Sequence, residues 1–361
     1  MRPEAGAAER RLSGLIVSRV TLRNYRSYPA LDLELSPGIV LVVGENGAGK
    51  TNLLEALHVG TQGFSPRTRA EGQLIRFGEP AASLRLNVVR DDVPHQVRVL
   101  LSTGAPKVAE LDGARMPAAE SLRRELPALV FTPDRLAVVK AGPAARRAYF
   151  DRVLGRLHPA RAGMPQDYAA ALAQRNAALR RVQLGLSGRD ALEPWTGRVA
   201  ALGLELVEAR QATLDALSPA FAVRGDELGL VGASLEYDGA PVTEAALTAR
   251  LDADVARGTT GAGPHLHDVR ITSAGRDLRS FGSQGEQRLT LLALLLAESE
   301  LLASQPLLLL DDVLSELDVR RRRVLAERIA GMEQAVVTAT QRSALPVEPA
   351  QIVEVTPGQA V

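Results

Sequence analysis

A glycine-rich segment after an apolar run constrains this chain more than any other feature. Residues 44–51 read Gly-Glu-Asn-Gly-Ala-Gly-Lys-Thr and follow the apolar run 39–43. The spacing is that of a phosphate-binding P-loop between a strand and a helix. The glycines allow successive backbone N–H groups to point inward, Lys50 supplies a charge for the β- and γ-phosphates, and the Thr51 hydroxyl is placed to ligate Mg²⁺. The structural alternative is a tight turn with an exposed lysine.

Residues around this loop form one predicted site for a nucleoside triphosphate. Arg26 lies in a turn close to the P-loop strand and is a candidate contact to adenine or ribose, although an ordinary edge-strand turn explains it equally well. The predicted nucleotide contacts are Gly44, Glu45, Asn46, Gly47, Ala48, Gly49, Lys50, Thr51, Asn52 and Arg26, and Lys50 is also predicted to be catalytic.

The composition sets limits on the class of protein. With 361 residues, 46% of them apolar, the chain can bury a full core in two lobes or domains. It has no cysteine, which excludes disulfides and thiolate metal sites and fits the cytoplasm. We find no apolar run of about 18 residues that would span a membrane. Residues 1–13 lack an apolar signal core, and we expect them to be a disordered extension.

Periodicity predicts an α/β fold. Alternating apolar residues predict an antiparallel β lobe packed on the P-loop core, from strands at 15–22, 31–35, 83–89, 96–101 and 108–111. Apolar runs predict further buried strands at 129–131, 306–310 and 335–338. The region 143–221 has helical periodicity. We therefore predict a head formed by 14–120 and 225–361, with an inserted helical domain at 121–224.

Two adjacent carboxylates follow the buried strand at 306–310. Because carboxyl ends of parallel strands share one sheet edge, Asp311 is expected near the P-loop, in the position that holds Mg²⁺ in P-loop enzymes. Asp312 points elsewhere and is the candidate general base for the attacking water. A solvated turn after a strand is the structural alternative.

The segment Ser283-Gln284-Gly285-Glu286 resembles the signature motif of ABC-type ATPases. That motif lies at a helix N-terminus and binds the γ-phosphate of ATP held by the other subunit, so the resemblance implies a dimer that sandwiches two nucleotides. A hydroxyl, a glycine and the free N–H groups of a helix start suit an anion. A simple capping box with Glu286 at its third position is the alternative, and both can hold. Residues 315–318 match the D-loop of the same superfamily, which places Asp318 at that interface.

Further segments resemble the RecF family of bacterial recombination mediators over roughly residues 15–342. They are Leu22-Arg23-Asn24-Tyr25-Arg26, Phe131-Thr132-Pro133-Asp134-Arg135-Leu136, residues 140–147, Gly263-Pro264-His265 and residues 281–285. The resemblance implies an ABC/SMC-like ATPase head with a small helical arm. It also implies slow, DNA-dependent ATP hydrolysis with Mg²⁺, an ATP-induced homodimer, and a role in DNA repair, replication and the SOS response. The implied task is loading RecA at single-stranded gaps with RecR and RecO.

Three positions depart from these patterns. Leu266 stands where the family usually has an arginine, so no charge is assigned there. Thr340-Gln341 occupies the place of the switch histidine of transporter ATPases, which weakens a transporter interpretation. Asp134 falls where related heads carry the Q-loop glutamine facing Mg²⁺, and is a candidate metal ligand. Gln62 is expected beyond the P-loop helix rather than at the metal.

DNA contacts are the least specific prediction. The net charge is only +1, and aromatic residues make up 3% of the chain, which favours contacts to the duplex backbone over base stacking. Candidate arginines are Arg67, Arg69, Arg123, Arg124, Arg146, Arg147, Arg175, Arg180 and Arg181, although a solvated surface explains each of them. The alternative functions are the nucleotide-binding subunit of a transporter, a chromosome-tethering ATPase head and a metabolic kinase.

Overall fold

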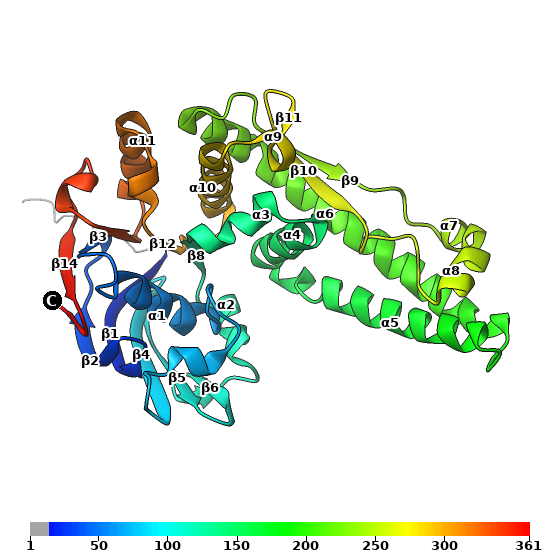
Figure 1. Ribbon diagram of the computed structural model, residues 1–361, viewed down its shortest axis with the longest axis horizontal. Coiled ribbons are helices and arrows are strands. Elements are labelled where there is room, and N and C mark those ends of the chain that lie inside the picture. The colour runs from blue at the N-terminus through cyan, green and yellow to red at the C-terminus, as the bar shows by residue number, and fades with distance from the viewer. Residues whose placement is uncertain (1–13) are drawn as a thin grey trace, which may run out of the picture. The chain divides into compact units, whose positions relative to one another are not determined.

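The computed structural model describes residues 14–361, except for the side chain of Asp134, and shows two compact units. The first comprises residues 14–135 together with 302–361, and the second comprises Leu136–Leu301 (Figure 1). The disordered extension predicted at 1–13 lies outside the described residues. Within 14–361 no helix has the length and apolarity needed to cross a lipid bilayer.

A six-stranded sheet forms the centre of the first unit. Its order is β15-β14-β3-β13-β12-β8, and every neighbouring pair is parallel except β14 and β15. The strands are β3 (Gly38–Val43), β8 (Ala128–Phe131), β12 (Leu307–Leu310), β13 (Gln334–Ala339), β14 (Gln351–Thr356) and β15 (Gln359–Ala360). The predicted strands at 129–131, 306–310 and 335–338 are confirmed, and they end at one edge of this sheet.

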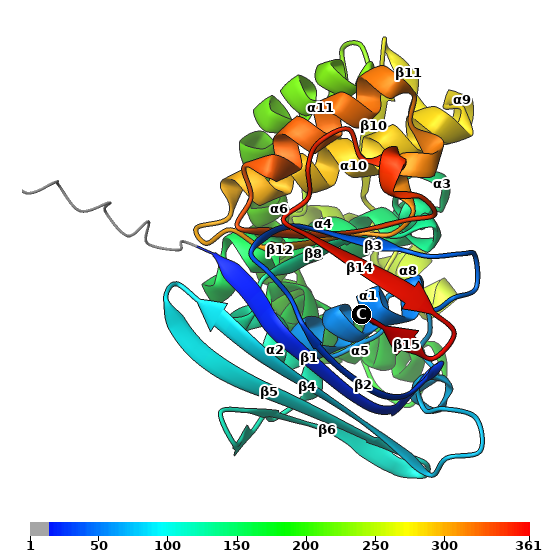
Figure 2. The ribbon, with the colours of Figure 1, turned by 90° about the vertical axis from the view of Figure 1, so that its left-hand side faces the viewer.

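A second, antiparallel sheet confirms the predicted β lobe. Its strands lie side by side in the order β2-β1-β4-β5-β6-β7 (Figure 2). They are β1 (Leu15–Tyr25), β2 (Tyr28–Glu34), β4 (Ala81–Arg90), β5 (Val93–Ser102), β6 (Ala105–Leu111) and β7 (Ala114–Arg115). Helix α1 (Lys50–Gln62) shares one apolar core with both sheets, and Gly60 lets it approach β4, because a Cβ there would lie 2.4 Å from Leu86. The unit also contains α2 (Leu122–Glu125) and α11 (Val319–Ala330).

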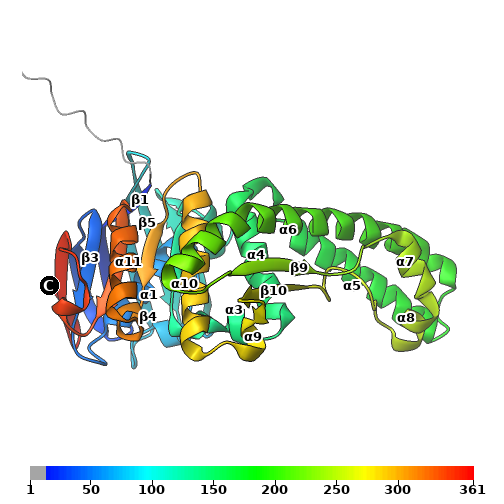
Figure 3. The same cartoon turned by 90° about the horizontal axis from the view of Figure 1, so that it is seen from above.

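The second unit is mostly helical, as predicted. Helices α5 and α6 run side by side (Figure 3), and both carry a proline in the first turn, where its missing N–H has no helical partner. The helices are α3 (Ala137–Lys140), α4 (Pro143–Leu157), α5 (Met164–Gln183), α6 (Glu193–Leu228), α7 (Glu244–Ala249), α8 (Leu251–Arg257), α9 (Leu278–Phe281) and α10 (Gln284–Leu301). A small sheet contains β9 (Ser234–Asp238), β10 (Asp268–Ser273) and β11 (Arg276–Asp277).

The two compact units differ in extent from the predicted head and insert. Residues 121–135, predicted to be helical insert, belong to the first unit, and β8 adds an edge strand to its parallel sheet. Residues 225–301, predicted to be head, belong to the second unit. The predicted boundary falls inside α6, because Gly225 continues the helix and its missing side chain makes room for Ala233, whose Cβ lies 2.6 Å from the Cβ position of Gly225.

Candidate nucleotide-binding site

The P-loop connects β3 to α1 with a backbone that needs its glycines. Gly47 and Gly49 have φ angles of +83° and +118°, a region that favours glycine. At Gly44 a Cβ would lie 2.4 Å from the Val355 carbonyl oxygen, which leaves no room for a side chain. The Tyr28 hydroxyl donates a hydrogen bond to the Gly49 carbonyl at 3.0 Å and holds the end of the loop. The loop therefore presents its backbone at the start of α1, as an anion site requires.

Lys50 lies across this loop. Its Nζ donates to the carbonyl oxygens of Gly44 at 2.7 Å and Glu45 at 2.8 Å. Burial lowers the pKa of Lys50, and the nearby carboxylates of Asp312 and Asp311 oppose that shift. The three side chains predicted to handle phosphate, metal and water are thus within electrostatic range of one another.

Asp311 meets the P-loop helix at the sheet edge. Its Oδ1 accepts hydrogen bonds from Thr51 Oγ1 at 3.0 Å and from Thr338 Oγ1 at 2.8 Å. Burial raises the pKa of this carboxyl, which its hydrogen bonds to Thr338 and Thr51 oppose. A hydroxyl and a carboxylate oxygen are ligands that Mg²⁺ prefers, and a cation would offset the cost of the buried charge. The residues present therefore fit the predicted metal.

Asp312 differs sharply from its neighbour. It is exposed, and its φ of +49° is unusual for a residue other than glycine. Its N–H donates to Thr338 Oγ1 at 2.8 Å. Thr338 thus contacts both acidic residues, and we did not predict this role. The signal for it was its place as a polar residue directly after the apolar residues 335–337 of β13, which pairs with β12.

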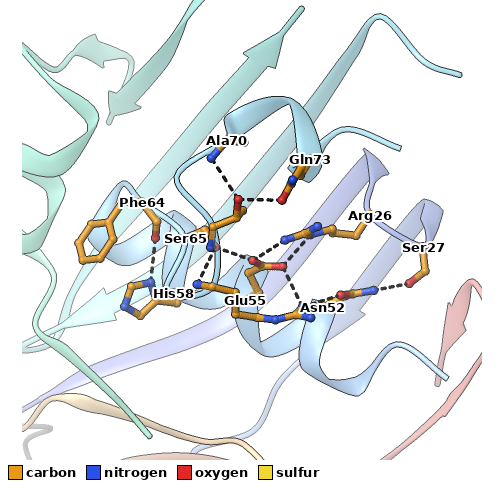
Figure 4. A network of polar contacts seen from close by, with 11 residues as sticks. Arg26, Ser27, Asn52, Glu55, His58, Phe64, Ser65, Ala70 and Gln73 are labelled. Atoms are coloured by element: carbon orange, nitrogen blue, oxygen red, sulfur yellow. Dashed lines mark hydrogen bonds and ion pairs between the residues drawn. The ribbon is translucent and has the colours of Figure 1, made fainter. Parts of the chain in front are cut away.

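The side chain of Arg26 is held by the P-loop helix (Figure 4). Its Nε and Nη2 each donate to the Glu55 carboxylate at 2.8 Å. Asn52 Nδ2 donates to Ser27 Oγ at 3.0 Å, and Asn52 Oδ1 accepts from Arg67 at 3.2 Å. The predicted contacts Arg26 and Asn52 therefore lie together. Glu55 was missed, because a glutamate within a helical pattern gives no sign of burial.

Asp134 and Gln62 are the two other residues considered for the metal site. Asp134 lies in a short 3₁₀ helix, Pro133–Leu136, directly after β8, and its side chain is outside the described part of the structure. Gln62 is the last residue of α1, buried, and donates to the Leu126 carbonyl at 2.8 Å. It is a structural residue, although it lies in the helix rather than in the following loop.

The signature-like segment forms the start of α10. The Ser283 N–H donates to Glu286 Oε2 at 2.8 Å, and Ser283 Oγ accepts from the Glu286 N–H at 3.2 Å, which is a capping box. Ser283, Gln284 and Gly285 are exposed, and Gly285 has open space around it. In the first unit, exposed Asp318 caps α11 by accepting from the Arg321 N–H at 2.8 Å. Both segments are folded as caps and accessible.

Two of the arginines considered for DNA binding are buried, which contradicts that prediction. Arg146 is 3% exposed and forms a bidentate ion pair with Asp268, at 2.7 and 2.6 Å. Arg175 is 0% exposed and pairs with Asp254 at 2.9 Å. Each of these arginines is therefore paired with a carboxylate inside the protein, where a buried charge needs a partner. Arg147 is half-buried and donates to a backbone carbonyl. Arg123 is half-buried, and the candidates that remain exposed are Arg67, Arg69, Arg124, Arg180 and Arg181.

Comparisons with known proteins agree with this architecture. The family model described as RecF/RecN/SMC N terminal domain matches residues 16–360. The DNA replication and repair protein RecF of Frankia alni is 37% identical, with 92% of this chain and 95% of that protein covered. A solved structure of the recombination mediator protein RecF-ATP in the RecFOR pathway superposes with a TM-score of 0.87 at 26% identity, over 99% of both chains. The Smc head domain of Pyrococcus furiosus shares the fold, with a TM-score of 0.60 at 18% identity.

Proposed function

Because the chain belongs to the RecF family of DNA replication and repair proteins, we propose that it binds and hydrolyses ATP and dimerises on ATP to hold DNA. Hydrolysis is slow and DNA-dependent. The protein acts in the cytoplasm, where it helps to load RecA at single-stranded gaps together with RecR and RecO. The contact between Thr51 and Asp311 at 3.0 Å carries the proposal, since it joins the P-loop to the acidic strand end.

Each residue at the sheet edge has a separate task in this proposal. The P-loop N–H groups and Lys50 bind the phosphates, and Thr51 and Asp311, with Asp134 as a further ligand, hold Mg²⁺. When bound, Mg²⁺ neutralises charge on the β- and γ-phosphate oxygens. Exposed Asp312 accepts the proton of the attacking water as general base.

The second half of the site comes from a partner subunit. The γ-phosphate replaces the Glu286 carboxylate as the acceptor for the Ser283 N–H. It also accepts from the Ser283 hydroxyl and from N–H groups at the start of α10, where the helix dipole favours an anion. Gln284, Gly285 and Asp318 line the same interface. Loss of the γ-phosphate then opens the dimer, because binding energy is shared between the two subunits.

DNA binding is proposed only for the exposed arginines that do not pair with Glu55. Arg69 and Arg124 lie in the first unit, and Arg180 and Arg181 lie near the end of α5 in the second. Backbone contacts of this kind release counterions, so affinity for duplex DNA should fall steeply as salt is raised.

The test is the molar mass in solution with Mg²⁺ and ATP, ADP or no nucleotide, each with and without a short duplex. The proposal expects a dimer with ATP only, which retains the duplex. Lys50→Ala should lose nucleotide binding, Ser283→Arg should bind ATP as a monomer, and Asp312→Asn should dimerise but not reset. Thr248→Arg, at another exposed helix position, is the control and should dimerise normally. A Ser283→Arg protein that still dimerises with ATP would refute the shared site.

A further inference from the structure

A fully buried carboxylate lies one helical turn after the P-loop threonine. Glu55 in α1 is 0% exposed, and besides Arg26 its carboxylate accepts the Ser65 hydroxyl at 2.5 Å and lies 3.5 Å from Arg67 Nη1 (Figure 4). A buried charge is costly unless it is paired and hydrogen-bonded. The Glu55 carboxylate stays paired and hydrogen-bonded only while these partner side chains remain in place. Glu55 therefore favours one fixed position for each of them.

Those partners come from two separate segments. Arg26 lies in the turn between β1 and β2, with a φ of +51° that few residues other than glycine adopt. Ser65 and Arg67 lie in the segment that follows α1. Asn52 reinforces the arrangement, since it bonds to Ser27 of the first segment and to Arg67 of the second. Glu55 and Asn52 together fasten both segments to the first turns of the P-loop helix.

The two guanidinium groups lie beside the site proposed for the nucleotide. Arg26, Asn52 and Arg67 line one open cavity of about 620 Å³, and Asn52 directly follows Thr51. The positive charge of Arg67 also acts to lower the pKa of Asp311, against the larger effect of burial. Arg67 is therefore within electrostatic range of the carboxylate proposed to hold the metal.

We infer that Glu55 is a positioning residue of the nucleotide site, which holds the guanidinium groups of Arg26 and Arg67 beside the P-loop helix for an anionic nucleotide. The inference rests on the proposed ATP binding and adds Glu55 and Arg67 to that site. Free arginine side chains lose rotamer entropy when a ligand fixes them. Because Glu55 fixes them before the ligand arrives, the binding step avoids much of that loss.

Positioning and simple electrostatics predict opposite changes in ATP affinity for Glu55→Gln. The substitution removes a negative charge near a polyanion, so electrostatics alone would tighten ATP binding. Positioning predicts weaker binding, about tenfold or more, because both arginines lose their fixed partner. The measurement is the Kd for a fluorescent ATP analogue with Mg²⁺, on protein shown by circular dichroism to be folded.

Glu298→Gln is the matched control. Glu298 is also a 0% exposed glutamate in a helix and is also paired with an arginine, Arg156, but it belongs to the second unit. Its substitution should lower stability by a similar mechanism and leave the Kd unchanged. If Glu55→Gln does not fold, Glu55→Asp keeps the charge and shortens its reach, and the same weakening is expected of it.

A double-mutant comparison tests whether Glu55 acts through the arginines. Adding Glu55→Gln to an Arg26→Gln, Arg67→Gln protein should change the Kd less than twofold, since nothing remains to be positioned. Unchanged or tighter binding by folded Glu55→Gln, or a full further loss in the arginine double variant, would overturn the inference. Failure of the proposed function gives a different result, in which Lys50→Ala binds the analogue as well as the unaltered protein does.

Discussion

Replacing Arg175 by alanine should destabilise the second unit rather than remove a surface contact. The guanidinium lies in the interior beside α5, where Nη1 donates to Asp254 at 2.9 Å and to the Thr260 hydroxyl at 2.7 Å. Its Nε donates to the Thr196 hydroxyl at 3.2 Å. Asp254 is itself only 1% exposed. Alanine would therefore leave a buried carboxylate without its counter-charge.

The expected loss of stability follows from that geometry. Removing one partner of a buried ion pair costs about 3–5 kcal/mol. For a unit the size of residues 136–301, 1 kcal/mol shifts the melting temperature by roughly 2–4 °C, so we expect a fall of about 6–20 °C. Trp195, the only tryptophan in the sequence, lies in α6 of the same unit, so its fluorescence reports this transition directly.

Two further variants complete the experiment. Arg180→Ala removes an exposed charge from the same helix and should change stability by less than about 0.5 kcal/mol. Arg175→Met combined with Asp254→Leu removes both charges and should recover most of the loss. A melting temperature for Arg175→Ala within about 2 °C of the unaltered protein would refute the argument. So would weakened DNA binding by a fully folded Arg175→Ala protein.

Three other substitutions follow from the same structure. Since burial raises the pKa of Asp311, its charge opposes folding at neutral pH, so Asp311→Asn should raise the melting temperature without nucleotide, and adding Mg²⁺ to ATP should raise it no further. Burial lowers the pKa of His267 to about 4, so its protonation favours unfolding as pH falls below about 6.5. The free energy of unfolding from urea titration should therefore fall between pH 7 and 5, by at most about 2 kcal/mol and by less where solvent screens the ring, and His267→Gln should reduce that fall. Gly49→Ala places a Cβ 2.9 Å from Ser27 Oγ at a φ of +118°, so titration should show weaker nucleotide binding in a folded protein.

The sequence predicted what depends on local pattern. The strand ending at Asp311 and the helix starting at Lys50 were found because apolar runs, glycines and carboxylates stand next to each other in the chain. Parallel pairing then brings Thr51 and Asp311, which are 260 residues apart, to a hydrogen bond. In such folds the carboxyl ends of parallel strands meet at one edge of the sheet. This contact could therefore be predicted without knowing how the side chains are oriented.

The sequence did not predict which charged side chains are buried. Arg146 and Arg175 look like surface arginines because their partners, Asp268 and Asp254, lie 122 and 79 residues further along the chain. Glu55 was overlooked for the same reason, since its pairing with Arg26 joins a helix to a turn of a different sheet. The predicted boundary at residue 225 falls inside a 36-residue helix, where Gly225 is a packing contact and not a helix terminus.

The order of the parallel sheet has a consequence for how the protein is made on the ribosome. The two neighbours of β3, the strand that carries the P-loop, are β13 and β14, which lie far along the chain at residues 334–356. The antiparallel sheet, by contrast, joins strands that are close in sequence and can form as soon as they emerge. During synthesis the hydrogen-bonding edges of the P-loop strand therefore stay unpaired until β13 and β14 have been translated. Nucleotide binding is in this sense a property that the chain acquires only after β14 has been made.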